Sequence, residues 1–342
     1  MTTAQINSLL SRGKFPEKTI RRELMETHIS WVILCDQFVY KIKKPVHYSF
    51  LDFSTPELRK YFCNREIELN KRLTYNVYLE VLPVGEWQEN IVIGGKEGTI
   101  IDYAVKMHKL DTAKRMDKLL TQHVVTESDI KKLAEQIAFF HKNTTIIYQK
   151  NLLDIQEKFN DLEVEKEFLA KQAGSKFDVI IGRAIEFSNK FLSINKGLIA
   201  DRLRNGFYRD GHGDLHSRNI FLLPDPVPFD CIEFNDDFRQ IDVLNEVAFL
   251  CMDLDAFDRK DLSTLFLEYY NHFFPAMQTA NERDLFIYYK SYRANIRAKV
   301  NSLRAKSATT AEEKAKSLMA AKKYLYLMES YIEELGTTHN GY

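Results

Sequence analysis

"DGHGDLHSRNIFLL", Asp210 to Leu223, is the densest stretch of polar chemistry in this chain. Two histidines, two aspartates, an arginine and an asparagine are followed at once by an apolar run with the character of a strand. Three interpretations compete for such a loop: a metal-hydrolase site, a phosphoryl-transfer loop, and a polar turn that carries no chemistry. The residues on either side of it decide between them.

The residues that follow the loop indicate a site built from hard oxygen ligands. Asn219 comes five residues after Asp214 and precedes the apolar run and the turn "PDPVP". A second strand-like piece then ends at Asp230, so a hairpin would bring Asp230 back beside Asn219. Two carboxylates and a carboxamide that converge in this way suit Mg²⁺, which binds through one or two carboxylates together with substrate phosphates.

Phosphoryl transfer by the kinase route requires such a set of groups. One aspartate orients and deprotonates the attacking hydroxyl, while an asparagine and a second aspartate hold the metal ions that bridge the phosphates. The spacing of Asp214 and Asn219 matches the kinase catalytic loop, whose asparagine follows its aspartate by five residues. A strand lysine braced by a helix glutamate must complete the set.

The N-terminal third supplies the lysine. "HISWVILCD" and "QFVYKIKKPV" predict a β-hairpin. Alternation along the second strand places Val39, Lys41 and Lys43 on one face and Tyr40 and Ile42 on the other. We choose Lys41, in the pattern V-x-K, as the lysine that steadies the phosphates.

A predicted helix supplies the glutamate. It begins with Thr55 or the serine before it as N-cap and with a proline in its first turn. Only one of Glu66 and Glu68 can face Lys41, because residues two apart point about 200° apart around a helix. We select Glu66, and Glu68 remains the alternative.

The order of the remaining elements predicts an α+β fold with two lobes. "VYLEVLPVGEW", "NIVIGG" and "GTIIDYAVKMHKL" indicate three further strands, and backbone groups from Val105 to His108, Met107 among them, are candidates for hydrogen bonding an adenine. After about Asp111 the chain is mostly helical, apart from the loop and short hairpin described above. We expect a small β-rich N-lobe over residues 1–108 and a larger helical C-lobe over residues 109–342.

Composition narrows the class of protein. The 48 basic and 48 acidic residues balance, so bulk charge indicates neither a nucleic-acid nor a membrane-surface partner. The N-terminus has no apolar run typical of a signal peptide, and no segment approaches the ~18 apolar residues of a membrane span. Four scattered cysteines without a CxxC pair indicate reduced thiols in a cytoplasmic protein.

The sequence resembles the aminoglycoside phosphotransferase family, which shares the protein-kinase-like fold with choline kinases. The resemblance rests on V-x-K, the helix glutamate, "HGDLHSRN", "FDCIEF" and "IDVLNEVAFL" in that order, and covers roughly Glu26 to Arg304. "ETHISWVIL", "VYKIKKPV" and "LDFST" resemble an uncharacterised bacterial branch of the family. Some members of that branch carry a further P-loop domain, but this chain has no G-x-x-x-x-G-K-[ST] motif.

The resemblance implies a role for each matching residue. Asp214 would be the catalytic base, and Asn219 and Asp230 would be Mg²⁺ ligands. Lys41 and its partner Glu66 would hold the ATP phosphates.

The resemblance also implies a structural role for one residue, and the sequence departs from the family pattern at one place. Asp242 would brace the catalytic loop. A G-x-G-x-x-G loop over the phosphates is missing, and the matching place reads Thr27-His28-Ile29-Ser30. Backbone amides and hydroxyls of that turn, Ser30 included, are the candidates for phosphate contacts.

Two other functions remain open. The first is a catalytically inactive nucleotide-binding regulator with the same fold. The second is a metal-dependent phosphoesterase, since "DGH" and "GDLH" resemble parts of a two-metal site, although no later G-N-H follows. His212 and His216 are expected to pack or hydrogen bond within the loop, because their spacing fits no helical zinc pair.

The sequence offers one clue to the acceptor, in the predicted helix "DLFIYYKSYRANIRAKVNSLRAKS". Lys290, Arg293, Arg297 and Arg304 fall within about 60° of one another on a helical wheel. Arg293 and Arg297 would suit a carboxylate or phosphate, so we hypothesise an anionic acceptor. The competing interpretation is a solvated basic face.

We therefore expect a small-molecule kinase whose partners are ATP and an acceptor with an alcohol group. It would transfer the γ-phosphoryl group with the help of Mg²⁺.

Overall fold

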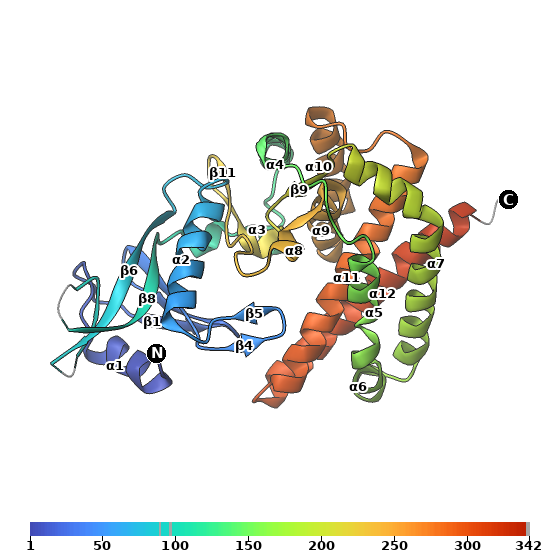
Figure 1. The fold of residues 1–342 in the computed structure, drawn as a ribbon. Coiled ribbons are helices and arrows are strands. Elements are labelled where there is room, and N and C mark those ends of the chain that lie inside the picture. Colours follow the sequence, from blue (N-terminus) through green and yellow to red (C-terminus); the bar gives the residue numbers. More distant parts are fainter. Residues whose placement is uncertain (89, 96–97, 340–342) are drawn as a thin grey trace. The chain divides into compact units, whose positions relative to one another are not determined.

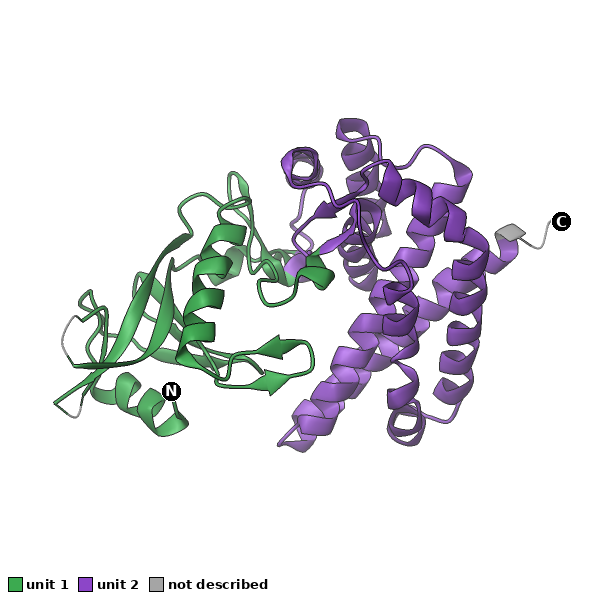
Figure 2. Ribbon diagram, viewed as in Figure 1, with its two compact units in different colours: residues 1–119, 218–239 green, residues 120–217, 240–342 purple. Residues whose placement is uncertain are grey.

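The computed structural model describes residues 1–88, 90–95 and 98–339. The chain forms two compact units, shown in different colours in Figure 2. Unit 1 consists of Met1–Leu119 and Arg218–Arg239, and unit 2 consists of Leu120–Ser217 and Gln240–Tyr342. The segment that carries Asn219 and Asp230 thus groups with the N-terminal residues.

Unit 1 is built on an antiparallel six-stranded sheet with the strand order β1-β2-β3-β8-β6-β7 (Figure 1). The predicted hairpin and the three further strands are confirmed. The strands are β1 (Glu23–Glu26), β2 (Ser30–Leu34), β3 (Phe38–Lys43), β6 (Tyr78–Trp87), β7 (Asn90–Ile93) and β8 (Thr99–His108). A short separate hairpin pairs β4 (His47–Tyr48) with β5 (Leu51–Asp52).

The two faces of the sheet bury different clusters, as the alternation in β3 predicts. Tyr40 and Ile42 belong to the cluster that includes Ile6 and Leu9 of α1 (Thr3–Arg12). Val39 packs on the other face, in the cluster with Cys63 of α2 (Pro56–Asn70). Lys41 and Lys43 share that second face by the same period of two.

Helix α2 begins where the sequence indicates. The Thr55 hydroxyl accepts a hydrogen bond from the Leu58 amide at 3.3 Å, and Pro56 occupies the first turn, where its missing N–H costs nothing. The helix lies along β6 and β8. It therefore presents its residues to the face of the sheet that carries the two lysines.

The predicted hairpin after the catalytic loop is also confirmed. It pairs β10 (Ile220–Leu222) with β11 (Pro226–Pro228), and the Phe229 amide donates to the Asn219 carbonyl at 2.9 Å. Short elements complete this part of the chain. They are η1 (Thr112–Lys114), η2 (Ser217–Asn219) and α8 (Asp236–Arg239).

The described residues of unit 2 are mostly helical and include a two-stranded pairing of β9 (Tyr208–Asp210) with β12 (Gln240–Asp242). Every residue of α9 (Val243–Ala256) is buried. Helix α11 (Ala280–Ser307) packs along α12 (Ala311–His339). The other helices are α4 (Glu127–Asn143), α5 (Asp154–Asn160), α6 (Glu163–Ala173), α7 (Lys176–Arg204) and α10 (Lys260–Phe273), with α3 (Met116–Thr121) at the boundary of the units.

The α+β architecture expected from the sequence is therefore confirmed. All four cysteines are buried, and none of them forms a disulfide within the described residues. Within the described ranges, no helix has the length and apolar character needed to cross a bilayer.

Candidate active site

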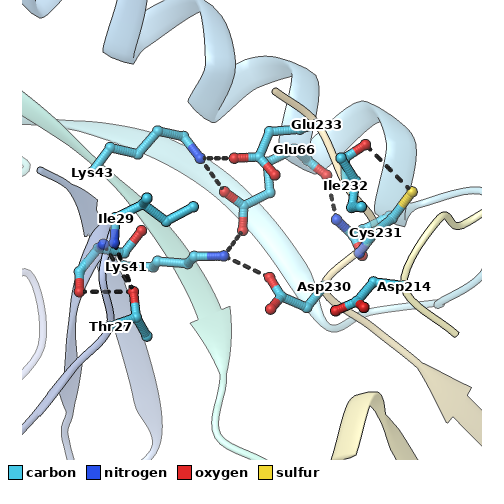
Figure 3. A network of polar contacts seen from close by, with 12 residues as sticks. Thr27, Ile29, Lys41, Lys43, Glu66, Asp214, Asp230, Cys231, Ile232 and Glu233 are labelled. Atoms are coloured by element: carbon cyan, nitrogen blue, oxygen red, sulfur yellow. Dashed lines mark hydrogen bonds and ion pairs between the residues drawn. The ribbon is translucent and has the colours of Figure 1, made fainter. Parts of the chain in front are cut away.

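The centre of the site in unit 1 is Lys41, which lies between two carboxylates (Figure 3). Its Nζ is 2.8 Å from Glu66 Oε1 and 2.6 Å from Asp230 Oδ1. Glu66 is fully buried on α2, whereas Glu68 is exposed. The structure therefore brings together Lys41, Glu66 and Asp230, and it places Glu66 rather than Glu68 beside the lysine.

The charges of this group stabilise one another. Burial opposes the charge of Lys41, but Asp230 and Glu66 outweigh burial and raise the Lys41 pKa well above its ordinary value. Burial likewise opposes ionisation of Glu66, yet Lys41 and Lys43 lower its pKa to about 2. Lys41 and Glu66 are therefore both ionised at neutral pH, and Lys41 is available as a permanent cation.

Asp230 has a backbone conformation that is rare for a residue with a side chain. Its φ is +64°, in the left-handed region, which is uncommon outside glycine and is enriched for Asp and Asn. Its amide donates to the Tyr78 hydroxyl at 3.0 Å. Because Tyr78 is buried, this bond fixes the turn that aims the carboxylate at Lys41.

The catalytic loop of unit 2 is supported by a buried glutamate. The His212 amide donates to Glu246 Oε1 at 2.6 Å, and the Asp214 amide donates to His212 Nδ1 at 3.2 Å. His216 Nε2 lies 3.3 Å from Asp214 Oδ2. Both histidines therefore pack and hydrogen bond within the loop, as the sequence predicts.

Asp214 has a pKa held below its ordinary value. Partial burial opposes its ionisation, but contact with His216 and the charge of Arg297 outweigh that effect. The Asp214 side chain is nevertheless 37% exposed, so it can receive a hydrogen bond from a bound molecule. Asp214 belongs to unit 2, whereas Asn219 and Asp230 belong to unit 1.

The prediction that Asp242 braces the catalytic loop is wrong. Its carboxylate instead accepts from Arg202 Nε at 2.6 Å and from Arg202 Nη2 at 2.9 Å, and it caps α9 at the Leu244 amide. The brace is Glu246, one helical turn later. The two acids are four positions apart, and this i, i+4 spacing is the signal that could have indicated both candidates.

The turn Thr27–Ser30 connects β1 to β2, at the place of the missing glycine-rich loop. Thr27 Oγ1 accepts from the Ser30 amide at 2.9 Å and from the Ile29 amide at 3.3 Å. The Ser30 hydroxyl is enclosed and has no partner among the described residues. Since these amides already donate within the turn, their predicted phosphate contacts stay a prediction.

The candidates for backbone contacts with an adenine, Val105 and Met107, belong to a strand inside the sheet. They lie on β8, which is flanked by β3 on one side and by β6 on the other. The next two amides are also engaged, since His108 donates to Val77 and Lys109 donates to Gln37, each at 2.9 Å. The backbone contacts predicted for Val105 to His108 therefore stay a prediction.

Arg293 and Arg297 are not part of a solvated face, because they are only 6% and 7% exposed. Arg293 Nε donates to Asn245 Oδ1 at 2.7 Å, and Nη1 lies 3.5 Å from the Gly213 carbonyl of the catalytic loop. Arg297 Nη2 makes a long 3.5 Å contact with the Tyr324 hydroxyl. Arg297 Nε is enclosed and has no hydrogen-bond partner in the part of the chain that the structure describes.

Solved structures of phosphotransferases and kinases share this two-unit α+β fold, which confirms the expected kinase-like fold. A spectinomycin phosphotransferase bound to AMP has a TM-score of 0.52 at 13% identity, with 99% of both chains covered. A choline/ethanolamine kinase family protein from Mesorhizobium loti has a TM-score of 0.51 at 11% identity, covering 96% of this chain and all of its own. At these identities the comparison establishes the fold.

Sequence relatives are found in mycobacteria. Proteins of Mycobacterium tuberculosis and Mycobacterium bovis, named only as uncharacterised proteins, are each 32% identical over 287 residues. The match covers 82% of this chain and 55% of each relative, so the chain spans about half the length of these proteins. No protein-family model matches the sequence.

Proposed function

We propose that the chain transfers the γ-phosphoryl group of ATP to a hydroxyl group of a small molecule, with Mg²⁺ as the metal ion. The observation that carries the proposal is the placement of Lys41 between Glu66 and Asp230, at 2.8 and 2.6 Å. In kinases a lysine held by a helix glutamate steadies the phosphates, and an aspartate near it holds the metal. The kinase-like fold supports the same assignment.

The nucleotide would lie on the face of the sheet that carries Lys41. Val32, Val39 and Phe229 belong to the apolar cluster on that face and suit an adenine ring. Asp230 and Asn219 offer the carboxylate and amide oxygens that Mg²⁺ prefers, so the donor set fits this ion. Bound Mg²⁺ would neutralise negative charge on the phosphates.

Asp214 would orient the acceptor hydroxyl and take up its proton. Because its pKa is lowered, the Asp214 carboxylate is ionised at neutral pH, and it can accept a hydrogen bond from the acceptor hydroxyl. Glu246 holds the loop because it accepts a hydrogen bond from the His212 amide at 2.6 Å. Arg293 makes a second contact with the loop, at the carbonyl of Gly213, the residue before Asp214. These contacts limit the freedom of the carboxylate before the acceptor binds.

We further propose that the acceptor is anionic and that Arg297 recognises its charge. Arg297 keeps an enclosed Nε without a partner among the described residues, and its charge already acts on Asp214. Arg293 is the poorer candidate, since its Nε donates to Asn245 at 2.7 Å. Arg297→Lys should raise KM for an identified acceptor and leave KM for ATP unchanged; an unchanged acceptor KM would refute this assignment.

Calorimetric titration with Mg²⁺ and a non-hydrolysable ATP analogue tests the nucleotide site. Asp230→Asn should weaken Mg²⁺-dependent binding at least ~10-fold, whereas Asp225→Asn, an exposed aspartate in the same hairpin, should bind like the wild type. Equal binding by Asp230→Asn would remove Asp230 from the metal site. Tight binding by the wild type without turnover would favour the inactive regulator, and ATP-independent ester hydrolysis would favour the phosphoesterase.

A further inference from the structure

Lys43, two residues after Lys41, forms a second buried ion-pair system on the same face of the sheet. Its Nζ lies 2.7 Å from Glu66 Oε2 and also hydrogen bonds Glu233 Oε1 (Figure 3). The Lys43 side chain has no exposed surface, and that of Glu233 is 5% exposed. A buried charge of this kind is stable only when it is paired and hydrogen bonded, so Lys43 depends on both carboxylates.

The two lysines and three carboxylates form a ladder. Lys41 pairs with Asp230 and Lys43 pairs with Glu233, while Glu66 joins the two pairs by giving one oxygen to each lysine. Asp230 and Glu233 are three residues apart on one segment. That segment is therefore attached to strand β3 at two points.

The two pairs differ in their access to solvent. The side chains of Lys41 and Asp230 are 13% and 43% exposed, so both can exchange their mutual contact for a ligand. Lys43 and Glu233 are enclosed and cannot. A metal ion that takes an Asp230 oxygen would break the outer pair and leave the inner pair intact.

We propose that Lys43 and Glu233 are positioning residues, which keep the Glu66 carboxylate and the Asp230 turn in place while the outer pair opens to Mg²⁺ and nucleotide. This proposal rests on the proposed function. Without Lys43, Glu66 would lose the partner of one oxygen and could rotate away from Lys41. Without Glu233, the turn after Asp230 would lose its ion pair with β3.

Those anchors show why the segment can transmit a displacement to Asp230. The Cys231 amide donates to Asn70 Oδ1 at 2.9 Å, and the Ile232 carbonyl accepts from Arg239 Nη1 at 2.8 Å. Asn70 in turn donates to the Glu66 carbonyl at 2.8 Å. The turn and the Glu66 end of α2 are thus one connected network, and the inner ion pair and Lys41 join this network to β3.

The test uses a double variant, because Lys43→Met alone would leave two buried carboxylates with reduced compensation and could prevent folding. Lys43→Met with Glu233→Leu removes one charge of each sign and replaces the pair by apolar groups, a change that is often neutral for stability. Lys306→Met with Glu165→Leu is the matched control, since Lys306 and Glu165 form an ion pair at 2.8 Å in unit 2 and neither belongs to the proposed site. Thermal unfolding establishes that each variant is folded.

The measurement is calorimetric titration of each full-length protein with Mg²⁺ and a non-hydrolysable ATP analogue. The folded double variant should bind the Mg²⁺–nucleotide at least ~10-fold more weakly than the wild type, and the control should bind equally well. A merely structural role would reduce the fraction of active protein and leave the Kd of that fraction unchanged. Wild-type affinity in the folded double variant would overturn this inference alone, whereas failure of the wild type to bind would overturn the proposed function and the inference with it.

Discussion

Gly211→Ala should disable the catalytic loop through a single added methyl group. A Cβ at this position would lie 1.8 Å from Glu246 Oε2 and 2.8 Å from Glu246 Cδ, distances that no packed structure accommodates. The Glu246 carboxylate cannot simply move aside, because it is buried and accepts the His212 amide at 2.6 Å. The substitution therefore forces Glu246 to release the loop.

The expected loss of stability is the sum of two effects, one lost hydrogen bond and one steric overlap. Leaving the buried His212 amide without a partner costs about 1–3 kcal/mol, and forcing a methyl group into a packed site costs about 1–3 kcal/mol more. We expect Gly211→Ala to lower the free energy of unfolding by about 2–6 kcal/mol. Phosphotransfer by the folded fraction should fall about 100-fold, the effect of a misplacement near 1 Å.

Urea unfolding and an activity assay check this prediction against a matched glycine. Gly197 lies within α7, and a Cβ there meets no atom within 4 Å. Gly197→Ala should raise the free energy of unfolding by up to about 1 kcal/mol, since alanine favours a helix, and should leave activity unchanged. If Gly211→Ala were as stable and active as Gly197→Ala, Glu246 could not be the brace of the loop.

Two further predictions concern buried charges of unit 2. Arg202→Met leaves the buried Asp242 carboxylate without the partner that binds it at 2.6 and 2.9 Å, so urea unfolding should show a loss of about 3–5 kcal/mol; a loss below 1 kcal/mol would contradict it. The second uses the Glu246 pKa, which burial raises but His141 and His212 lower to a net value under its ordinary 4.5. The stability that comes from a lowered pKa is complete above pH 4.5 and is lost as the pH falls through the folded-state pKa. The unfolding free energy of Glu246→Gln should therefore decline less steeply below pH 4.5 than that of the wild type, with a difference in slope of at most about 1.4 kcal/mol per pH unit. Parallel curves of unfolding free energy against pH would refute the coupling.

Local patterns made much of this fold predictable. The Thr55 cap, the alternation in β3 and the hairpin that returns to Asp230 each depend on neighbours within a few residues. The choice of Glu66 over Glu68 succeeded as a placement because helical geometry allows only one of them to face the sheet. The chemistry encoded in short stretches is therefore legible without a structure.

What escaped the sequence depends on packing between distant segments. Glu233 meets Lys43 across 190 positions, and no local rule connects them. Strand order, which places β8 between β3 and β6, is likewise a property of the whole sheet that no local pattern reveals. Arg293 and Arg297 formed a basic stripe on a helical wheel, but the burial of both side chains could be seen only in the fold.

Transfer of the labelled γ-phosphoryl group of ATP to a metabolite extract tests the central claim most directly. With Mg²⁺, the wild-type protein should move label from ATP onto an extract component, and Asp214→Asn should lower that transfer at least ~100-fold while it still binds nucleotide. Asp225→Asn should transfer label like the wild type. Undiminished transfer by Asp214→Asn, or a wild type that binds Mg²⁺–ATP and labels nothing, would contradict the account.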